Sequence, residues 1–430
     1  MRVAKLEIHH VGPFGDLVLN FLEKPAGIEN KAEIHILTGE NGTGKTTILE
    51  VMADCLKDLM SRQLLTKCRN TIKKNASAAI SIPGNNSHAS KFNKVAIMGG
   101  GLRPFNNNEK INSYWEKIKN PWGDPAFSFA FFAYAGYRRI SNIQISGIQE
   151  LDEHPLKNAL DFQYTADPQP ILQWIANTIA AEAIANTQNE KEEAKQRREA
   201  IDRLEKSIGN IIDKKISFKL ETKPYAVRIE VDSERLDFNH LPDGLKSIVS
   251  WLSDLLMRMD RVKWKNEIAV FERNFILFLD EIEVHMHPAW QRKILPVVQN
   301  LFPNAQIFIS THSPFVVGSV DGAWIHKLVK PNGDSQLAEG YPKLSEDARS
   351  FRYWLDEVFD ITSEYGVEAD KQLKHFYALR DEVFKGGNGI IQESLIQAGQ
   401  ALADQSQEMR QIIEMELRQI NRRLSLQLGL

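Results

Sequence analysis

Hydrophobic and polar residues alternate at the start of the chain in two short runs, 3–9 and 16–21. Such alternation is typical of strands with one buried face, and the Gly-Pro-Phe-Gly between the runs favours a turn, so the pattern predicts a hairpin. A third strand is predicted at 33–38, and a helical spacing of apolar residues follows from Ile48 to Leu56. We therefore expect the order strand, glycine-rich loop, helix near the beginning of the chain.

The second half of the chain carries two nearly continuous apolar runs, 275–279 and 306–310, with a helical pattern at 288–301 between them. Strands without polar alternation are expected in a parallel sheet that is covered on both faces. Three shorter strands are predicted within 216–238. A strongly apolar helix is then expected from Ser247 onward.

The remaining segments suggest a division of the chain into five regions. Asn, Lys, Ser and Gly are frequent in the first half of 61–165, which predicts inserted loops and short strands. A helical insertion is expected at 166–214, where Glu and Arg four residues apart are typical of a solvated helix face. A helical C-terminal region is expected at 346–430, with one apolar face. The stretches 1–60 and 215–345 are then the two parts of one α/β unit.

Composition restricts the class of protein. The chain has 430 residues, of which 43% are apolar and 25% charged, which excludes collagen-like and wholly disordered chains. The net charge of −3 gives no overall basic field for nucleic acid, but it does not exclude a local basic groove. The two cysteines, Cys55 and Cys68, are too few for a disulfide framework. No stretch is long enough for a membrane helix and no signal-peptide core is present, so we expect a cytoplasmic protein with no membrane partner.

The segment Gly39-Glu-Asn-Gly-Thr-Gly-Lys-Thr46 matches the phosphate-binding pattern Gly-x-x-x-x-Gly-Lys-Thr. Glycines allow backbone N–H groups to close around phosphate oxygens at a helix N-terminus. Lys45 would neutralise the terminal phosphates, and the Thr46 hydroxyl would hold Mg²⁺. An accidental glycine turn is the alternative, which the flanking strand and helix disfavour. The predicted nucleotide-binding residues of this loop are Gly39, Asn41, Gly42, Thr43, Gly44, Lys45, Thr46 and Thr47.

Two carboxylates, Asp280 and Glu281, follow the apolar run 275–279. Strand ends are where an open α/β sheet binds its ligands. Asp280 would reach Mg²⁺, and Glu281 is predicted to polarise the water that attacks the γ-phosphate of ATP. His312 follows the next apolar strand and would sense the same phosphate. The alternatives are solvated acids at the end of a buried strand and a surface histidine.

Together these motifs resemble those of the ABC-type ATPase heads in the SMC, RecF and overcoming-lysogenization-defect group, in particular the stand-alone bacterial Septu-type, retron-associated and PARIS-like members linked to antiphage defence. The resemblance covers about residues 1–60 and 215–330. The run Asp-Glu-Ile-Glu-Val-His-Met-His-Pro, ending at Pro288, is similar to the Walker B motif and D-loop of the group. It implies an α/β fold, an ABC-type P-loop ATPase head with a mixed sheet and flanking helices. A zinc site at His285 and His287 is disfavoured, because residues two apart do not share a helix face.

The segment Leu241-Pro-Asp-Gly-Leu-Lys246 is similar to the signature motif of the same group, commonly Leu-Ser-Asp-Gly. The resemblance implies that Gly244 and Lys246 contact ATP held by a second subunit, so that ATP lies at the interfaces of a homodimer or higher homo-oligomer. Pro242 departs from the pattern, because the family serine would donate a hydrogen bond to phosphate, and we expect weakened binding in trans that Lys246 compensates. A plain turn with a helix cap is the alternative.

A Q-loop glutamine is not evident. The segment 133–141 lies where this element is expected and carries Arg138 and Arg139 instead. These arginines either contact phosphate or the second subunit, or belong to a structural turn at the surface. Both interpretations stay open.

The resemblance implies an ATP-hydrolysing switch. No Asp-x-Asp follows Ser313, so we predict that this chain carries no TOPRIM-type nuclease and controls a separate nuclease or toxin effector. The alternative is a RecF- or SMC-like repair ATPase that acts on DNA directly through basic residues between Lys191 and Arg203. Interleaved glutamates weaken that basic patch. A transporter subunit is disfavoured because a glutamine-bearing Q-loop is not recognisable.

Overall fold

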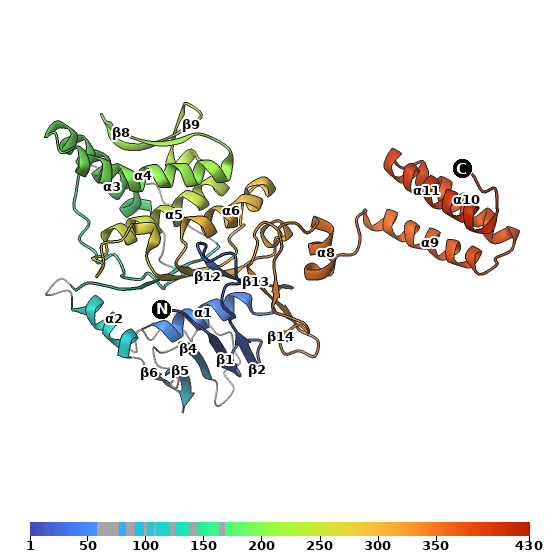
Figure 1. Cartoon of the computed structure of the whole chain (residues 1–430), viewed down its shortest axis with the longest axis horizontal. Helices are drawn as coiled ribbons and strands as arrows, with labels where there is room; N and C mark the ends of the chain where they lie inside the picture. The colour runs from blue at the N-terminus through green and yellow to red at the C-terminus, as the bar shows by residue number, and fades with distance from the viewer. Residues whose placement is uncertain are drawn as a thin grey trace. The chain divides into compact units, whose positions relative to one another are not determined.

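The structure is a computed structural model that divides into two compact units, Met1–Trp354 and Leu355–Leu430. Figure 1 shows the course of the chain. The residues that the structure describes are 1–57, 77–82, 91–98, 101–106, 109–120, 125–136, 145, 147–162 and 168–430.

The larger unit contains a seven-stranded sheet in the order β14-β13-β3-β12-β11-β7, with β15 also paired to β13. Its strands are β3 (Glu33–Gly39), β7 (Ala130–Tyr134), β11 (Phe275–Leu279), β12 (Ala305–Ser310), β13 (Trp324–Val329), β14 (Gln336–Leu337) and β15 (Lys343–Leu344). Only β14 and β15 run antiparallel to their neighbour. Since parallel strands end at one edge of a sheet, the loops after β3, β7, β11 and β12 lie together.

Helices cover both faces of this sheet (Figure 1). The helix α1 (Lys45–Leu56) lies on one face and contacts β3, β11 and β12. The opposite face carries a layer of four helices, namely α3 (Pro168–Thr187), α4 (Lys191–Ile212), α5 (Asp243–Arg261) and α6 (Pro288–Leu301). Because both faces are covered, every residue of β7, β11 and β12 is buried. This arrangement confirms the predicted fold class, an α/β head with flanking helices.

Two smaller antiparallel sheets complete the unit. The first has the order β2-β1-β4-β5-β6 and packs beneath α1. It contains β1 (Lys5–His9), β2 (Asp16–Asn20), β4 (Ser77–Ile82), β5 (Lys91–Met98) and β6 (Gly101–Asn106), and α2 (Glu109–Lys119) follows. The second sheet is formed by β8 (Ile216–Thr222), β9 (Tyr225–Val231) and β10 (Glu234–Asp237). The predicted hairpin and the three predicted strands within 216–238 are thus confirmed, and strands from 77–106 extend the N-terminal sheet.

The predicted helical stretch near 170–212 is interrupted. Asn189 has a positive φ of 63°, a conformation that Asn tolerates better than most residues, and it separates α3 from α4. On α4, Arg197 pairs with Glu193 at 3.2 Å and Arg203 with Glu199 at 2.6 Å. These ion pairs leave little net charge on the helix face considered above for DNA.

The smaller unit is helical, with α9 (Val367–Phe384), α10 (Gly389–Ala403) and α11 (Gln407–Leu424) around its own core, while α8 (Phe351–Phe359) spans the unit boundary. Ile413, Leu417 and Ile420 of α11 are buried as predicted, but Leu424 is exposed. The short strands β14 and β15 lie before α8 in the sequence. Short helices occur at Phe238–His240 (η1), Val270–Glu272 (η2) and Pro314–Val317 (α7).

Among the described residues, every helix is too short or too polar to cross a lipid bilayer.

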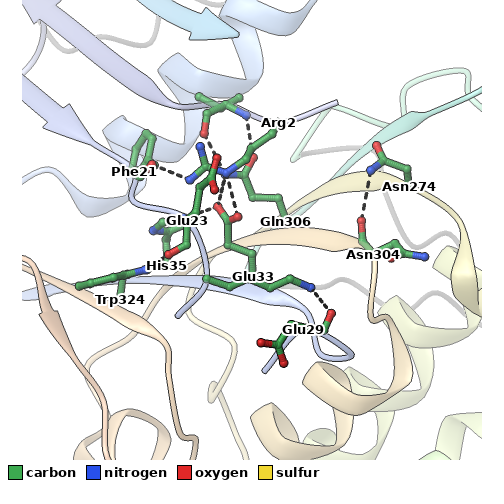
Figure 2. A network of polar contacts seen from close by, with 12 residues as sticks. Arg2, Phe21, Glu23, Glu29, Glu33, His35, Asn274, Asn304, Gln306 and Trp324 are labelled. Atoms are coloured by element: carbon green, nitrogen blue, oxygen red, sulfur yellow. Dashed lines mark hydrogen bonds and ion pairs between the residues drawn. The ribbon is translucent and has the colours of Figure 1, made fainter. Parts of the chain in front are cut away.

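A polar network ties the start of the chain to the edge at which the parallel strands begin (Figure 2). Arg2 Nε donates to both carboxylate oxygens of Glu33, at 3.0 and 2.8 Å. Gln306 Nε2 donates to Glu33 Oε1 at 2.6 Å, and His35 Nε2 lies 2.8 Å from the same oxygen. His35 Nδ1 lies 3.2 Å from His326 Nε2 in the fully buried interior. The network therefore ends in two buried imidazoles.

We expect the free energy of unfolding to fall as the pH drops below about 6.5, the ordinary histidine pKa. Burial lowers the pKa of both His35 and His326, so they stay neutral in the folded protein at a pH where the unfolded chain binds protons. Unfolding then takes up protons, and each histidine contributes at most about 1.4 kcal/mol per pH unit. Urea unfolding between pH 7.5 and 5.5 should show a weaker pH dependence in His326→Gln than in the wild type. The exposed His375→Gln is the control, and equal slopes in all three proteins would contradict the prediction.

Candidate functional site

The ends of two strands, β11 and β12, and the start of helix α1 meet around the Asp280 carboxylate. Thr46, in the first turn of α1, donates its hydroxyl to Asp280 and lies 3.0 Å from both Oδ1 and Oδ2. Ser310, the last residue of β12, donates to Asp280 Oδ1. The N–H of Glu281 donates to Ser310 Oγ at 2.8 Å. The structure thus brings the predicted Mg²⁺ ligands, Thr46 and Asp280, into direct contact although they are 234 residues apart.

The loop from Gly39 to Gly44 needs its glycines. Gly39, Gly42 and Gly44 have φ values of 137°, 81° and 94°, which L side chains rarely adopt. A Cβ at Gly39 would overlap the carbonyl of Leu328, so the loop also passes too close to β13 for a side chain. Lys45 Nζ donates to the carbonyl oxygens of Gly39 and Glu40, both at 3.0 Å. The lysine thereby closes the loop from inside.

Three acidic side chains lie near the buried ammonium of Lys45. Burial lowers the pKa of Lys45, and the carboxylates of Glu281, Asp280 and Glu283 act in the opposite direction. Burial raises the pKa of Asp280, while hydrogen bonds from Ser310 and Thr46 oppose the rise. Because three acids face one buried cation, the site carries an excess of negative charge that a further cation would balance.

His312 belongs to the same cluster. Burial, and then the charge of Lys45, lower the pKa of His312, so its neutral imidazole is favoured near pH 7. The Asp280 carboxylate acts on the same ring in the opposite direction. The four predicted residues with direct chemical roles, Lys45, Asp280, Glu281 and His312, therefore lie within electrostatic reach of one another.

Glu281 sits in an unusual backbone conformation. Its φ is +44°, and sparsely populated conformations of this kind cluster at functional sites. Gly136, just after β7, approaches it so closely that a Cβ there would lie 2.7 Å from Glu281 Cβ. The predicted Q-loop segment is described only as far as Gly136. Arg138 and Arg139 lie outside the described residues.

Sequence reasoning assigned no role to Glu283, although it is the third acid of the Asp-Glu-Ile-Glu run. Glu283 Oε1 accepts a hydrogen bond from the backbone N–H of His312 at 2.6 Å, and burial raises the pKa of Glu283. Beside it, Ser313 Oγ donates to Gln291 Oε1 at 2.6 Å. These bonds fix the loop after β12 to the segment that follows β11. The acidic run 280–283 could have indicated a role for Glu283, whereas no sequence feature pointed to Gln291.

A second contact missed from the sequence joins the site to α5. The carbonyl of Tyr134 accepts a hydrogen bond from the N–H of Asp280 at 2.9 Å. The hydroxyl of the same tyrosine donates to Asp254 Oδ2 at 2.8 Å, and Arg258 Nε donates to that oxygen at 2.7 Å. Asp254 is 1% exposed, so this network is internal. One residue, Tyr134, therefore contacts both the Asp280 backbone and the helix α5.

The signature-like segment differs from prediction in its secondary structure. Helix α5 begins at Asp243 rather than at Ser247, because an acidic residue is favoured in the first turn of a helix. Gly244 and Lys246 thus lie in that turn, and Lys246 Nζ is 3.7 Å from Asp243 Oδ1. A Cβ at Gly244 would lie 2.5 Å from the carbonyl oxygen of His285. Within the described chain, neither residue adds a hydrogen bond or an ion pair to the cluster around Asp280.

The two D-loop histidines have separate local environments. His287 Nδ1 accepts a hydrogen bond from the N–H of Ala289 at 3.2 Å and so caps α6. His285 has a positive φ of 62° and is exposed. Over the residues that the structure describes, no group of three His, Cys, Asp or Glu side chains could hold a metal ion.

These features define a P-loop nucleotide-binding protein of the ABC type: a glycine loop closed by its lysine, and a carboxylate from a neighbouring parallel strand that contacts the loop's threonine. A family model described as "AAA domain, putative AbiEii toxin, Type IV TA system" matches residues 34–318, and a second AAA-domain model matches residues 1–63. The chain belongs to this family of AAA-domain proteins, and the domain implies ATP binding.

Several known proteins are similar over most of their length. The Septu protein PtuA of Bacillus thuringiensis is 22% identical over 370 residues, which are 83% of each chain. The Retron Ec83 probable ATPase of Escherichia coli is 23% identical over 454 residues, covering 89% of this chain and 80% of that protein. Among solved structures, an SMC head bound to the C-winged helix domain of ScpA aligns with a TM-score of 0.46 and 14% identity, over 79% of this chain and 97% of that one. The resemblance to Septu and retron ATPases inferred from motifs is confirmed at the level of distant homology.

Proposed function

We propose that this protein hydrolyses ATP and uses ATP binding as a switch that controls a separate nuclease or toxin effector in a bacterial antiphage defence complex. The observation that carries the ATPase part is the contact of Thr46 with Asp280 beside Lys45 and Glu281. The names of the Septu and retron relatives support the defence part.

The oxygen donors at the site suit Mg²⁺, which prefers carboxylate, hydroxyl and phosphate oxygens. Thr46 and Asp280 would hold the ion, and Ser310 fixes the carboxylate in place. When bound, Mg²⁺ supplies positive charge against the phosphates of ATP. The fit rests on the mutual contact of these hydroxyl and carboxylate groups, which places two oxygen donors of the kind that Mg²⁺ prefers side by side.

Each remaining residue has a role in hydrolysis that follows from its position. Lys45 binds the terminal phosphates, and the N–H groups of the glycine loop surround them. Glu281 orients and polarises the attacking water. His312, neutral near pH 7, hydrogen-bonds the γ-phosphate or the water beside it. Loss of the γ-phosphate removes these contacts, so the two nucleotide states differ in energy and the site acts as a switch.

Subunit assembly is a further part of the proposal. Gly244 and Lys246 lie in the first turn of α5, where backbone N–H groups favour an anion. ATP bound by one subunit would contact this turn in another, which gives a homodimer or higher homo-oligomer with nucleotide at the interfaces. Lys246 already pairs with Asp243, so the attraction in trans is weak and turnover is slow.

The proposal is tested by isolating the complex that ATP stabilises. Tagged Glu281→Gln protein, expressed from its native locus, should retain a stoichiometric nuclease or toxin that survives treatment of the extract with nuclease. Lys45→Ala, in which ATP binding is expected to be weakened, is the matched control and should recover less of this partner. Recovery of DNA and repair proteins that are lost on nuclease treatment would contradict the defence function and favour direct action on DNA.

A further inference from the structure

A cavity of about 360 Å³ lies at the edge of the central sheet opposite to the P-loop. β3 begins beside it at Glu33 and ends at Gly39 in the P-loop, so the two sites occupy the two ends of one strand. Figure 2 shows part of its wall, formed by the side chains at the beginnings of the parallel strands. The volume is within the range of small-molecule sites. Its polar and aromatic lining includes Arg2, Lys24, Trp264, Arg273, Asn274 and Gln306.

Among the residues that the structure describes, no anion pairs with Arg273, which is a buried cation. It is only 9% exposed, and its Nε is buried with no hydrogen-bond partner. The guanidinium donates to the carbonyl of Asn266 and packs over the ring of Trp264, with Cζ 5.1 Å from the ring centroid. Burial lowers the pKa of Arg273, and no acidic neighbour opposes this effect. A buried charge without a partner is unfavourable, which indicates that the partner is a ligand.

The acids nearest to the cavity do not neutralise Arg273. Glu33 is engaged by Arg2, Gln306 and His35. Glu272 is exposed and, within the described structure, forms no ion pair with Arg273. The cavity therefore keeps an unbalanced positive charge.

Lys24 lines the same cavity, and two further lysines lie near Phe127, another lining residue. Lys24 Nζ donates to backbone carbonyls, among them Lys31 O at 2.9 Å. Lys117 Nζ lies 5.7 Å from the ring of Phe127, which lines the cavity, and the N–H of Lys265 donates to the carbonyl of Phe127 at 2.8 Å. Burial, and then the charge of Lys265, lower the pKa of Lys117. Mutual repulsion between lysines is relieved by an anion placed among them.

We propose that this cavity binds a phosphate-bearing ligand through Arg273, at a site separate from the ATP site. The guanidinium presents several donors in a plane that matches phosphate oxygens, and phosphate brings more negative charge than a carboxylate into a region with several cations. Both a free phosphorylated small molecule and the 5′-phosphate of a nucleic acid present this group.

The test uses full-length protein with Lys45→Ala, so that phosphate binding at the P-loop is weakened. Inorganic phosphate should raise the melting temperature of this protein, since a ligand of the folded state stabilises it. Adding Arg273→Met should weaken phosphate binding by about tenfold or more, the scale of a lost charge-assisted hydrogen bond. Arg235→Met, which alters an exposed arginine on β10, should leave phosphate binding unchanged.

Titration calorimetry with two short oligonucleotides, one with a 5′-phosphate and one with a 5′-hydroxyl, identifies the source of the phosphate. Tighter binding of the phosphorylated oligonucleotide than of inorganic phosphate indicates a nucleic-acid end, and no gain indicates a free small molecule. If Arg273→Met does not fold, Arg273→Lys, which keeps the charge without the planar donors, should bind phosphate more weakly than the parent.

The proposal is overturned if no phosphate probe binds the Lys45→Ala protein, or if Arg273→Met binds phosphate as the parent does. A fall in melting temperature without ligand, together with unchanged phosphate binding, would assign Arg273 to packing on Trp264. None of these outcomes bears on ATP hydrolysis, because the P-loop is already inactive in the parent protein.

Discussion

Glu281→Gln should bind ATP as the wild type does and lose at least about a hundredfold in the rate of hydrolysis, the lower range for removal of a general base. The amide has nearly the shape of the carboxylate, so the close approach of Gly136 and the contact of Thr46 with Asp280 are preserved. It cannot polarise water as a carboxylate does. Equilibrium binding of ATP and phosphate release in a single turnover measure the two effects separately.

Glu283→Gln is the matched control for this variant. It removes a neighbouring carboxylate, but the amide oxygen can still accept the hydrogen bond from the N–H of His312. We therefore expect a much smaller loss of hydrolysis. If Glu281→Gln releases phosphate at the wild-type rate, or if Glu283→Gln has the larger effect, the assignment of Glu281 as the base is wrong.

Lys45→Ala should weaken ATP binding by about 2–5 kcal/mol, the usual loss when one member of a close charge pair is truncated. This corresponds to roughly thirtyfold to several thousandfold in the dissociation constant. The ammonium that would bind phosphate also donates to Gly39 and Glu40 in the loop. The charge of Lys45 lowers the pKa of Asp280, so its removal should raise the pKa of that carboxyl. Titration with ATP at fixed salt concentration measures the loss of affinity.

Lys45→Met separates charge from packing, because methionine keeps most of the length of the side chain without the ammonium. Both variants should lose ATP binding to a similar extent if the charge dominates. An affinity within about threefold of the wild type in Lys45→Ala would contradict the P-loop assignment, since less than 1 kcal/mol would then separate the proteins. Thermal unfolding without nucleotide shows whether either variant is folded.

Residues at strand ends were predictable because of a topological rule rather than local chemistry. Thr46 and Asp280 are far apart in the sequence, yet each follows a strand of one parallel sheet, and parallel strands end at a common edge. The apolar runs at 275–279 and 306–310 were sufficient to locate those strands. His312 was found in the same way, from its place just after β12.

Contacts between side chains in separate layers were not predictable. Tyr134 and Asp254 are 120 residues apart, and each lies in an apolar stretch of sequence. Such a stretch predicts that the residue is buried, but it does not predict which side chain it contacts. The start of α5 was also misplaced, since Pro242 and Asp243 read equally well as a turn before a helix and as its cap and first turn. Short strands were expected within 61–165, but their bounds within 77–106 were not predictable, because their Asn, Lys and Ser residues resemble those of loops.

The tie between Tyr134 and α5 has a mechanical consequence. A helix rises about 1.5 Å per residue and behaves as a stiff rod, so Asp243 and Asp254 are separated by about 16 Å along the axis of α5. A tilt of about 5° pivoting at Asp254 would move the start of the helix by about 1.4 Å, by simple leverage along a rod of that length. A tilt of α5 that accompanies a shift of the Asp280 backbone would therefore be largest at the first turn of the helix, where Gly244 and Lys246 lie.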